Sequence, residues 1–148
     1  MTNLKNQYSS TTNAIDKIQK ILSENGARKV MFDYGQNGQL VAIAFQIVLE
    51  GKEVSFRLPA MIENVVEILY GGKNKWGATK KVTEAQKEQG YRTAWANIRD
   101  WLDAQMALVK TKQVELPQIF LPYMITRSGQ TLYEHIIDDP KFLLGDGN

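Results

Sequence analysis

One stretch of the chain combines lysines with a tryptophan and contains no acidic residue. It runs from Gly71 to Val82 and reads as a loop after a short helix. Lysines neutralise phosphates, and an exposed tryptophan can stack on an unpaired base, so the pattern is typical of single-strand binding. Alternatively, the lysines keep a mobile loop soluble and the tryptophan anchors it in the core. The candidate nucleic-acid-binding residues are Lys73, Lys75, Trp76, Lys80 and Lys81, with Arg92 extending the track.

A second pattern is that of a metal-dependent nuclease. Asp33, Glu50 and Lys52 form a D…E-x-K series, which resembles the restriction-endonuclease-like nucleases. In that family the acidic residues bind Mg²⁺ and the lysine steadies the attacking water. Here Glu50-Gly51-Lys52 reads as a hairpin turn rather than the middle of a strand, and so loose a pattern often arises by chance. The alternative is an ordinary charged turn.

Other catalytic and metal-binding chemistry finds little support in the composition. The chain has no cysteine, which removes thiolate nucleophiles, zinc-thiolate sites and disulfides. Its only histidine, His135, lies in an expected surface helix, and we assign it no role. No glycine-rich phosphate loop or Ser/His/Asp set is present. We therefore favour a non-enzymatic function, with no catalytic residue, metal or cofactor.

Length and composition indicate one small domain in a reducing cytoplasm. The chain has 148 residues, no cysteine and a formal net charge of +2, which is too small to indicate a nucleic-acid partner by itself. The N-terminus lacks an export signal, and the longest apolar run, Leu40 to Phe45, is far shorter than the ~20 residues of a membrane span. We expect a flexible arm at 1–10, one soluble domain at 11–140 and a flexible tail at 141–148.

Hydrophobic periodicity predicts an α+β fold, in which a three-stranded antiparallel meander packs against one long helix with shorter helices beside it. The meander covers about Lys29 to Leu58 and turns at Asn37-Gly38 and at Gly51-Lys52. One face of its middle strand is continuously apolar, while alanines and polar residues occupy the other. The apolar face consists of Val41, Ile43, Phe45, Ile47 and Leu49.

Helices are expected before and after the meander in the chain. The first covers about Thr12 to Asn25, and a short second one begins at Pro59 and ends before Gly71. The long helix begins at a capping box, Thr83 with Gln86, and runs to about Lys112.

The C-terminal part should pack against the long helix. An apolar segment with two prolines, residues 114–124, is expected to lie across that helix as a clasp. Thr131 and Glu134 then form a second capping box, which begins a last short helix ending near Pro140.

Four segments of the C-terminal half form a distinctive series: Tyr91–Trp95, Ile98–Leu108, Phe120–Met124 and Gly129–Glu134. They resemble a family of small uncharacterised proteins encoded by phages and prophages, and the likeness extends more loosely over the first helix and the meander. The resemblance implies a phage protein in the bacterial cytoplasm, where nucleic-acid handling and interference with host defence are the usual tasks. It brings no catalytic residue.

These observations support three functions in order. The first is a non-enzymatic phage accessory protein that binds nucleic acid, in particular single strands exposed during replication or recombination. The second is an inhibitor or adaptor that binds a protein of a host defence complex. The third is a Mg²⁺-dependent nuclease.

Overall fold

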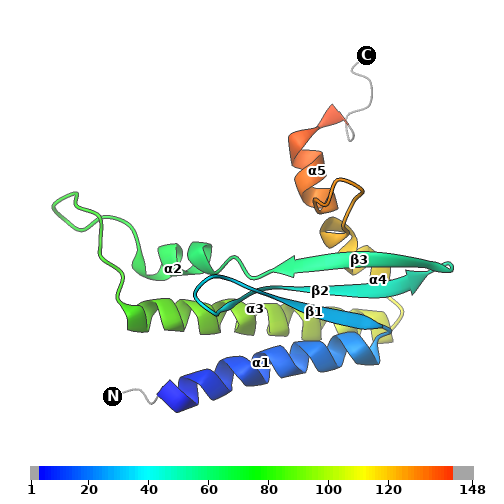
Figure 1. Ribbon diagram of the computed structural model, residues 1–148, viewed down its shortest axis with the longest axis horizontal. Coiled ribbons are helices and arrows are strands. Elements are labelled where there is room, and N and C mark those ends of the chain that lie inside the picture. Colours follow the sequence, from blue (N-terminus) through cyan, green and yellow to red (C-terminus); the bar gives the residue numbers. More distant parts are fainter. Residues whose placement is uncertain (1–3, 142–148) are drawn as a thin grey trace.

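A three-stranded antiparallel sheet forms the middle of the molecule, with its strands in the order β1-β2-β3 (Figure 1). The computed structural model describes residues 4–141, with side chains from residue 11 onward. The strands are β1 (Lys29–Tyr34), β2 (Leu40–Leu49) and β3 (Lys52–Pro59). The predicted meander is therefore confirmed, with its last strand one residue longer than expected.

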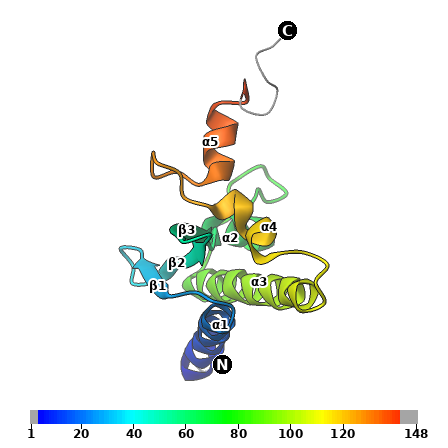
Figure 2. The ribbon, with the colours of Figure 1, turned by 90° about the vertical axis from the view of Figure 1, so that its right-hand side faces the viewer.

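Helices cover one face of the sheet and extend from its ends. They are α1 (Leu4–Glu24), α2 (Ile62–Tyr70), α3 (Glu84–Lys110), α4 (Leu116–Phe120), the 3₁₀ helix η1 (Leu121–Tyr123) and α5 (Leu132–Asp138). Helices α1 and α3 lie side by side against the sheet, and α5 projects from the body beyond β3 (Figures 1 and 2). The α+β class and the single long helix agree with the sequence.

The two faces of β2 differ as its alternation predicts. Ile43, Phe45 and Ile47 are buried in the hydrophobic core, and the residues paired with the first two on β3, Leu58 and Phe56, are buried there as well. Side chains at alternate positions point to one side of a strand, so cross-strand partners form one continuous apolar surface. That surface is the side of the sheet that packs on the helices.

An ion pair between β1 and β3 lies on the opposite face of the sheet. Arg57 Nε lies 3.4 Å from Asp33 Oδ2, and both side chains are partly exposed. In the register, Asp33 is opposite Ala42 and Arg57 is opposite Ala44, so the pair crosses β2 above these two alanines. Both alanines are buried although they face away from the core cluster. Small side chains on β2 therefore leave room for the ion pair.

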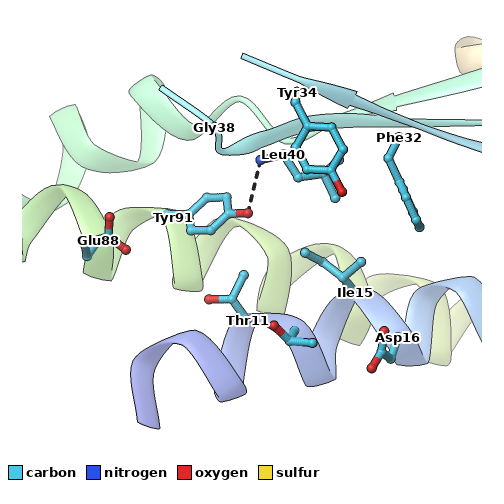
Figure 3. Close-up of a pocket in the computed structure, with 10 residues that line it drawn as sticks. Thr11, Ile15, Asp16, Phe32, Tyr34, Gly38, Leu40, Glu88 and Tyr91 are labelled. Atoms are coloured by element: carbon cyan, nitrogen blue, oxygen red, sulfur yellow. Dashed lines mark hydrogen bonds between the residues drawn. The ribbon is translucent and has the colours of Figure 1, made fainter. Parts of the chain in front are cut away.

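The start of β2 is attached to α3 by two side chains. The Leu40 N–H donates to Tyr91 Oη at 3.1 Å (Figure 3). Trp95 Nε1 donates to the Leu40 carbonyl at 3.0 Å. Trp95 is fully buried, so its N–H needs such a partner. The helix thus fixes both backbone polar groups of one strand residue.

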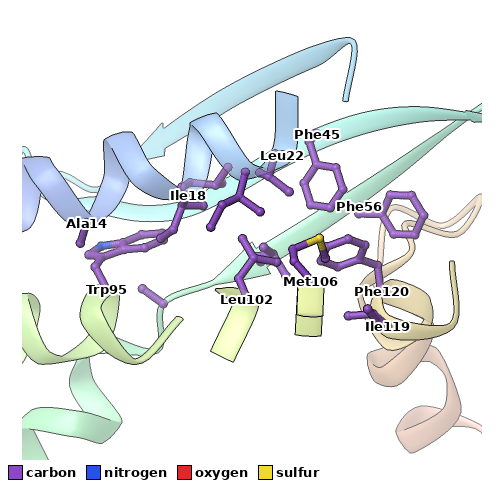
Figure 4. Close-up of a cluster of buried hydrophobic side chains, with 14 of the residues drawn as sticks. Ala14, Ile18, Leu22, Phe45, Phe56, Trp95, Leu102, Met106, Ile119 and Phe120 are labelled. Atoms are coloured by element: carbon purple, nitrogen blue, oxygen red, sulfur yellow. The ribbon is translucent and has the colours of Figure 1, made fainter. Parts of the chain in front are cut away.

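An aromatic cluster closes the core at the other end of α3 (Figure 4). The Phe120 ring centroid lies 4.9 Å from that of Phe45 and 5.8 Å from that of Phe56. Trp101 of α3 meets Phe120 edge-on at 6.2 Å. The proline-containing segment at 114–124, which forms α4 and η1, therefore packs against both the sheet and the long helix, as predicted.

The two predicted capping boxes are confirmed. Thr83 Oγ1 accepts from the Gln86 N–H, and the Gln86 side chain accepts from the Thr83 N–H, so both bonds of the first box are present. Thr131 and Glu134 make the same reciprocal pair at the start of α5. Thr83 and Thr131 mark the starts of α3 and α5, because each box supplies hydrogen-bond partners for N–H groups that the first turn of a helix leaves unpaired.

Two predicted boundaries differ from the structure, and a third prediction is not tested by it. Helix α1 begins at Leu4 rather than Thr12, because no glycine or proline interrupts the chain before Gly26, and the predicted arm at 1–10 overlaps the helix from Leu4 onward. Pro59 ends β3 instead of beginning a helix, and α2 starts only after Met61, whose φ is 52°. The predicted tail at 141–148 lies outside the described residues from residue 142 onward.

Candidate nucleic-acid interface

The basic segment after α2 folds into a small hairpin. The Lys80 N–H donates to the Gly72 carbonyl at 2.9 Å, and the Asn74 N–H donates to the Ala78 carbonyl at 2.8 Å. Lys73 and Thr79 pair between them as an antiparallel bridge. We call residues 72–80 the basic hairpin. It extends beyond α2 at the end of the molecule opposite α4 and the turn between β2 and β3 (Figure 1).

The Asn74 side chain organises the tip of the basic hairpin. Its Oδ1 accepts from the N–H of Trp76 at 2.9 Å and from the N–H of Ala78 at 3.1 Å. Gly77 completes the turn with a φ of 80°, which favours glycine. Asparagine side chains stabilise turns in this way by replacing a backbone acceptor. The tip is thus held by local hydrogen bonds.

Trp76 lies at this tip and is 79% exposed. The Lys75 ammonium lies 4.6 Å from the centroid of its ring, within the range of a cation–π contact. An anchoring tryptophan would be buried, so the alternative in which Trp76 fixes a loop to the core is wrong. The indole is presented to solvent with a positive charge beside it.

The other lysines of the segment lie on the arms of the basic hairpin or directly after it. All are exposed, and within residues 11–141 none forms an ion pair with a carboxylate. Since residues 71–82 contain no acid, their positive charges are not neutralised inside the segment. The structure brings together Lys73, Lys75 and Lys80 on the basic hairpin, with Lys81 directly after it.

Arg92 does not belong to this group. It lies on α3 about 200° around the helix from Gly90, the residue that contacts α2, so the two point to opposite sides of the helix. Its Nη2 donates to Gln89 Oε1, and its Nε is buried without a hydrogen-bond partner among the described residues. The half-buried guanidinium is thus engaged within α3.

Asp33 lies far from the other two residues of the nuclease pattern, Glu50 and Lys52. Asp33 pairs with Arg57 and is opposite Ala42, near the start of β2. Glu50 lies in the turn after β2, about 25 Å further along the strand direction. Within the described residues, no three histidine, aspartate or glutamate side chains gather closely enough to hold a metal ion. Lys52 follows Glu50 at the same distant turn.

Two surfaces were missed from the sequence. Helix α2 exposes apolar side chains, above all Ile68 at 84%, which the sequence did not single out. A pocket also opens between α1, the β1–β2 turn and α3 (Figure 3). The spacing of apolar residues in this nine-residue helix did not show that Ile68 would be exposed. The pocket combines residues that are distant in the chain.

Comparisons do not connect this site with a known protein. Among residues 4–141, no helix combines the length and the apolar composition that a bilayer crossing requires. No protein-family model matches the chain, and no match was found among curated proteins or among solved structures.

Proposed function

We propose that this protein binds single-stranded nucleic acid through the basic hairpin and does not cut it. The observation that carries the proposal is the exposure of Trp76 at the tip of a hydrogen-bonded turn, on a hairpin whose lysines form no ion pair within residues 11–141. Aromatic rings stack on unpaired bases of any sequence, and lysines follow the phosphate backbone. Asp33 of the nuclease pattern lies at the opposite end of β2 from Glu50 and Lys52.

Each part of the basic hairpin has a separate role in this proposal. Trp76 stacks on a base through the ring surface that Lys75 does not cover, while Lys73, Lys80 and Lys81 contact phosphates. The hydrogen bonds of Asn74 support this arrangement, because a turn that is already formed loses less conformational entropy on binding. In the phage setting that the sequence resemblance implies, single strands arise during replication and recombination.

The test is the anisotropy of a labelled oligonucleotide, titrated with protein at several salt concentrations. Trp76→Ala should weaken binding by ~1 to 3 kcal/mol. Changing Lys73, Lys75, Lys80 and Lys81 together to alanine should reduce the slope of log affinity against log salt by about 2 units, since three of these lysines contact phosphates and each single-strand contact contributes about 0.7.

The matched control changes four exposed lysines outside the basic hairpin, so that net charge falls equally. Lys20, Lys29, Lys52 and Lys110 serve this purpose. Affinity should fall much less in this variant than in the hairpin variant. Equal losses in the two variants, or no binding by the wild-type protein, would refute the proposed interface.

A second candidate function is binding of a host protein, as an inhibitor or adaptor in a defence complex. The observation that favours it is the apolar surface of α2, where Ile68, Leu69 and the preceding Met61 are all exposed. Exposed apolar patches rimmed by polar residues often mark protein-binding sites. This surface lies on the helix that leads into the basic hairpin.

The two candidates are separated by capture from a bacterial lysate with two variants in parallel. Ile68→Glu should abolish capture of a protein partner and leave oligonucleotide binding unchanged. The lysine-free hairpin variant, in which Lys73, Lys75, Lys80 and Lys81 are all alanine, should lose oligonucleotide binding and still capture the protein partner. Recovery of nucleic acid alone, unaffected by Ile68→Glu, would refute the second candidate.

A further inference from the structure

The pocket between α1, the β1–β2 turn and α3 has the dimensions of a small-ligand site. Its volume is about 490 Å³, inside the range of about 300 to 1,000 Å³ that such sites occupy. It lies apart from the basic hairpin, on the side of α3 that faces α1 and β1 (Figure 3).

Rings and aliphatic side chains form the walls of the pocket. Tyr91 contributes its ring from α3, where its hydroxyl is fixed by the Leu40 N–H. Phe32 and Tyr34 line the pocket from β1, and Ile15 lines it from α1. Aromatic faces attract cations, and the aliphatic side chain offers contact to methylene groups.

Carboxylates provide the charge of the pocket. Asp16 and Glu88 lie toward opposite ends, with the rings of Tyr91 and Tyr34 between them (Figure 3). Among the lining residues from Thr11 onward there is no lysine or arginine, and within residues 11–141 neither carboxylate forms an ion pair. The described part of the lining therefore has two carboxylates and no basic side chain.

We propose that this pocket binds an aliphatic polyamine. A chain of methylene groups with an ammonium at each end matches a hollow that has apolar walls and a carboxylate toward each end. A ligand with one cation would satisfy only one carboxylate, and an anion such as nucleic acid would be repelled. The site is thus distinct from the proposed function of the basic hairpin and does not depend on it.

The experiment compares putrescine with n-butylamine, which has the same four-carbon chain and one charge fewer, by ¹H–¹⁵N chemical-shift titration. Saturable shifts are expected at the amides of Tyr34, Gly38 and Glu88. Putrescine should bind at least about fivefold more tightly than n-butylamine, which is the ratio for one additional partly exposed ion pair. Shifts that rise linearly without saturation would overturn the proposal.

Two variants test the carboxylates. Asp16→Asn and Glu88→Gln should each weaken putrescine binding by about fivefold and bring its affinity close to that of n-butylamine. The matched control is Glu84→Gln, one turn earlier on α3 and outside the pocket, which should leave the affinity unchanged. An equal effect of Glu84→Gln would show a general charge effect and overturn the site.

Two further titrations define the source of the cation and the independence of the site. Acetyl-arginine-amide is the probe for a side chain of a protein partner, and tighter binding of this probe than of putrescine would overturn the polyamine assignment. The lysine-free hairpin variant should bind putrescine like the wild type. A loss of putrescine binding in that variant would overturn the separation of the two sites.

Discussion

Val66 of α2 packs directly against Gly90 of α3, where a side chain on the glycine would overlap the valine Cγ2. Gly90 is buried in the interior of a long helix, a position where glycine is normally unfavourable. Its presence is explained by the close approach of the two helices. Because the basic hairpin follows α2 directly, this contact also fixes the direction from which the hairpin leaves the body.

Gly90→Ala should therefore destabilise the protein. In an open helix this substitution stabilises by about 0.5 to 1 kcal/mol, but overpacking a tight contact costs about 1 to 3 kcal/mol. Urea denaturation should show a net loss. Adding Val66→Ala should recover part of it, because the smaller side chain makes room for the new methyl group. A stabilised Gly90→Ala protein would contradict the observed contact.

Phe120→Ala should cost about 3 to 5 kcal/mol of unfolding free energy, because the ring is fully buried between the sheet and α3. Leu121→Ala is the matched control, since the next side chain is 46% exposed and should cost far less. Urea denaturation of both variants measures the difference. Similar losses would show that the segment at 114–124 does not dock through Phe120.

Substitutions of Asn74 separate the shape of the basic hairpin from its charge. Asn74→Ala removes the acceptor of two backbone hydrogen bonds and should weaken oligonucleotide binding by loosening the tip, with little change in melting temperature. Asn74→Asp keeps an acceptor and adds a negative charge, so its binding defect should grow at low salt, where charge is less screened. Anisotropy titrations at two salt concentrations distinguish these effects.

The capping box of α5 should open in acid. The Thr131 backbone N–H donates to the Glu134 carboxylate and lowers its pKa, and the Thr131 hydroxyl and the charge of Arg57 act in the same direction. Because the folded pKa is below the unfolded value, this stabilisation is present above about pH 4.3 and is lost as the pH falls through the folded pKa.

An NMR pH titration of the Thr131 amide follows this step directly. Glu134→Gln keeps a capping acceptor that does not titrate, so the low-pH change in the Thr131 signal should disappear in that variant. The same change in both proteins would assign it to another group.

Much of the fold could be predicted because local patterns and tertiary packing agree. The alternation around Ile43 and Phe45 predicted both the strand and its buried face, and Thr83 and Thr131 marked two helix starts through reciprocal hydrogen bonds. The start of α1 was not found, because polar residues before Thr12 are compatible with either a helix or a loop.

The site was predictable in its composition but not in its shape. Lysine content and the absence of acids identified the segment, yet its hairpin depends on the Asn74 side chain and on backbone pairing without any hydrophobic alternation. The sequence could not decide whether Trp76 is buried, because burial is predicted from the regular spacing of several apolar residues and Trp76 is a single aromatic residue in a polar segment. The sequence places Arg92 near the basic segment at the start of the long helix. The direction of its side chain depends on its angle around α3, which proximity in sequence does not give.

The attachment of Leu40 to Tyr91 and Trp95 has a consequence for synthesis of the chain on the ribosome. The sheet is complete in sequence at Pro59, but its main cover, α3, is made later. At about 5 to 20 residues per second, Trp95 follows the end of the sheet after roughly 2 to 7 s. During that interval Phe45 and Phe56 lack the helix that buries them. The nascent chain therefore passes through a stage that is exposed to aggregation and open to chaperones, and this stage ends after α3 docks onto Leu40 and Phe120 packs onto the two rings.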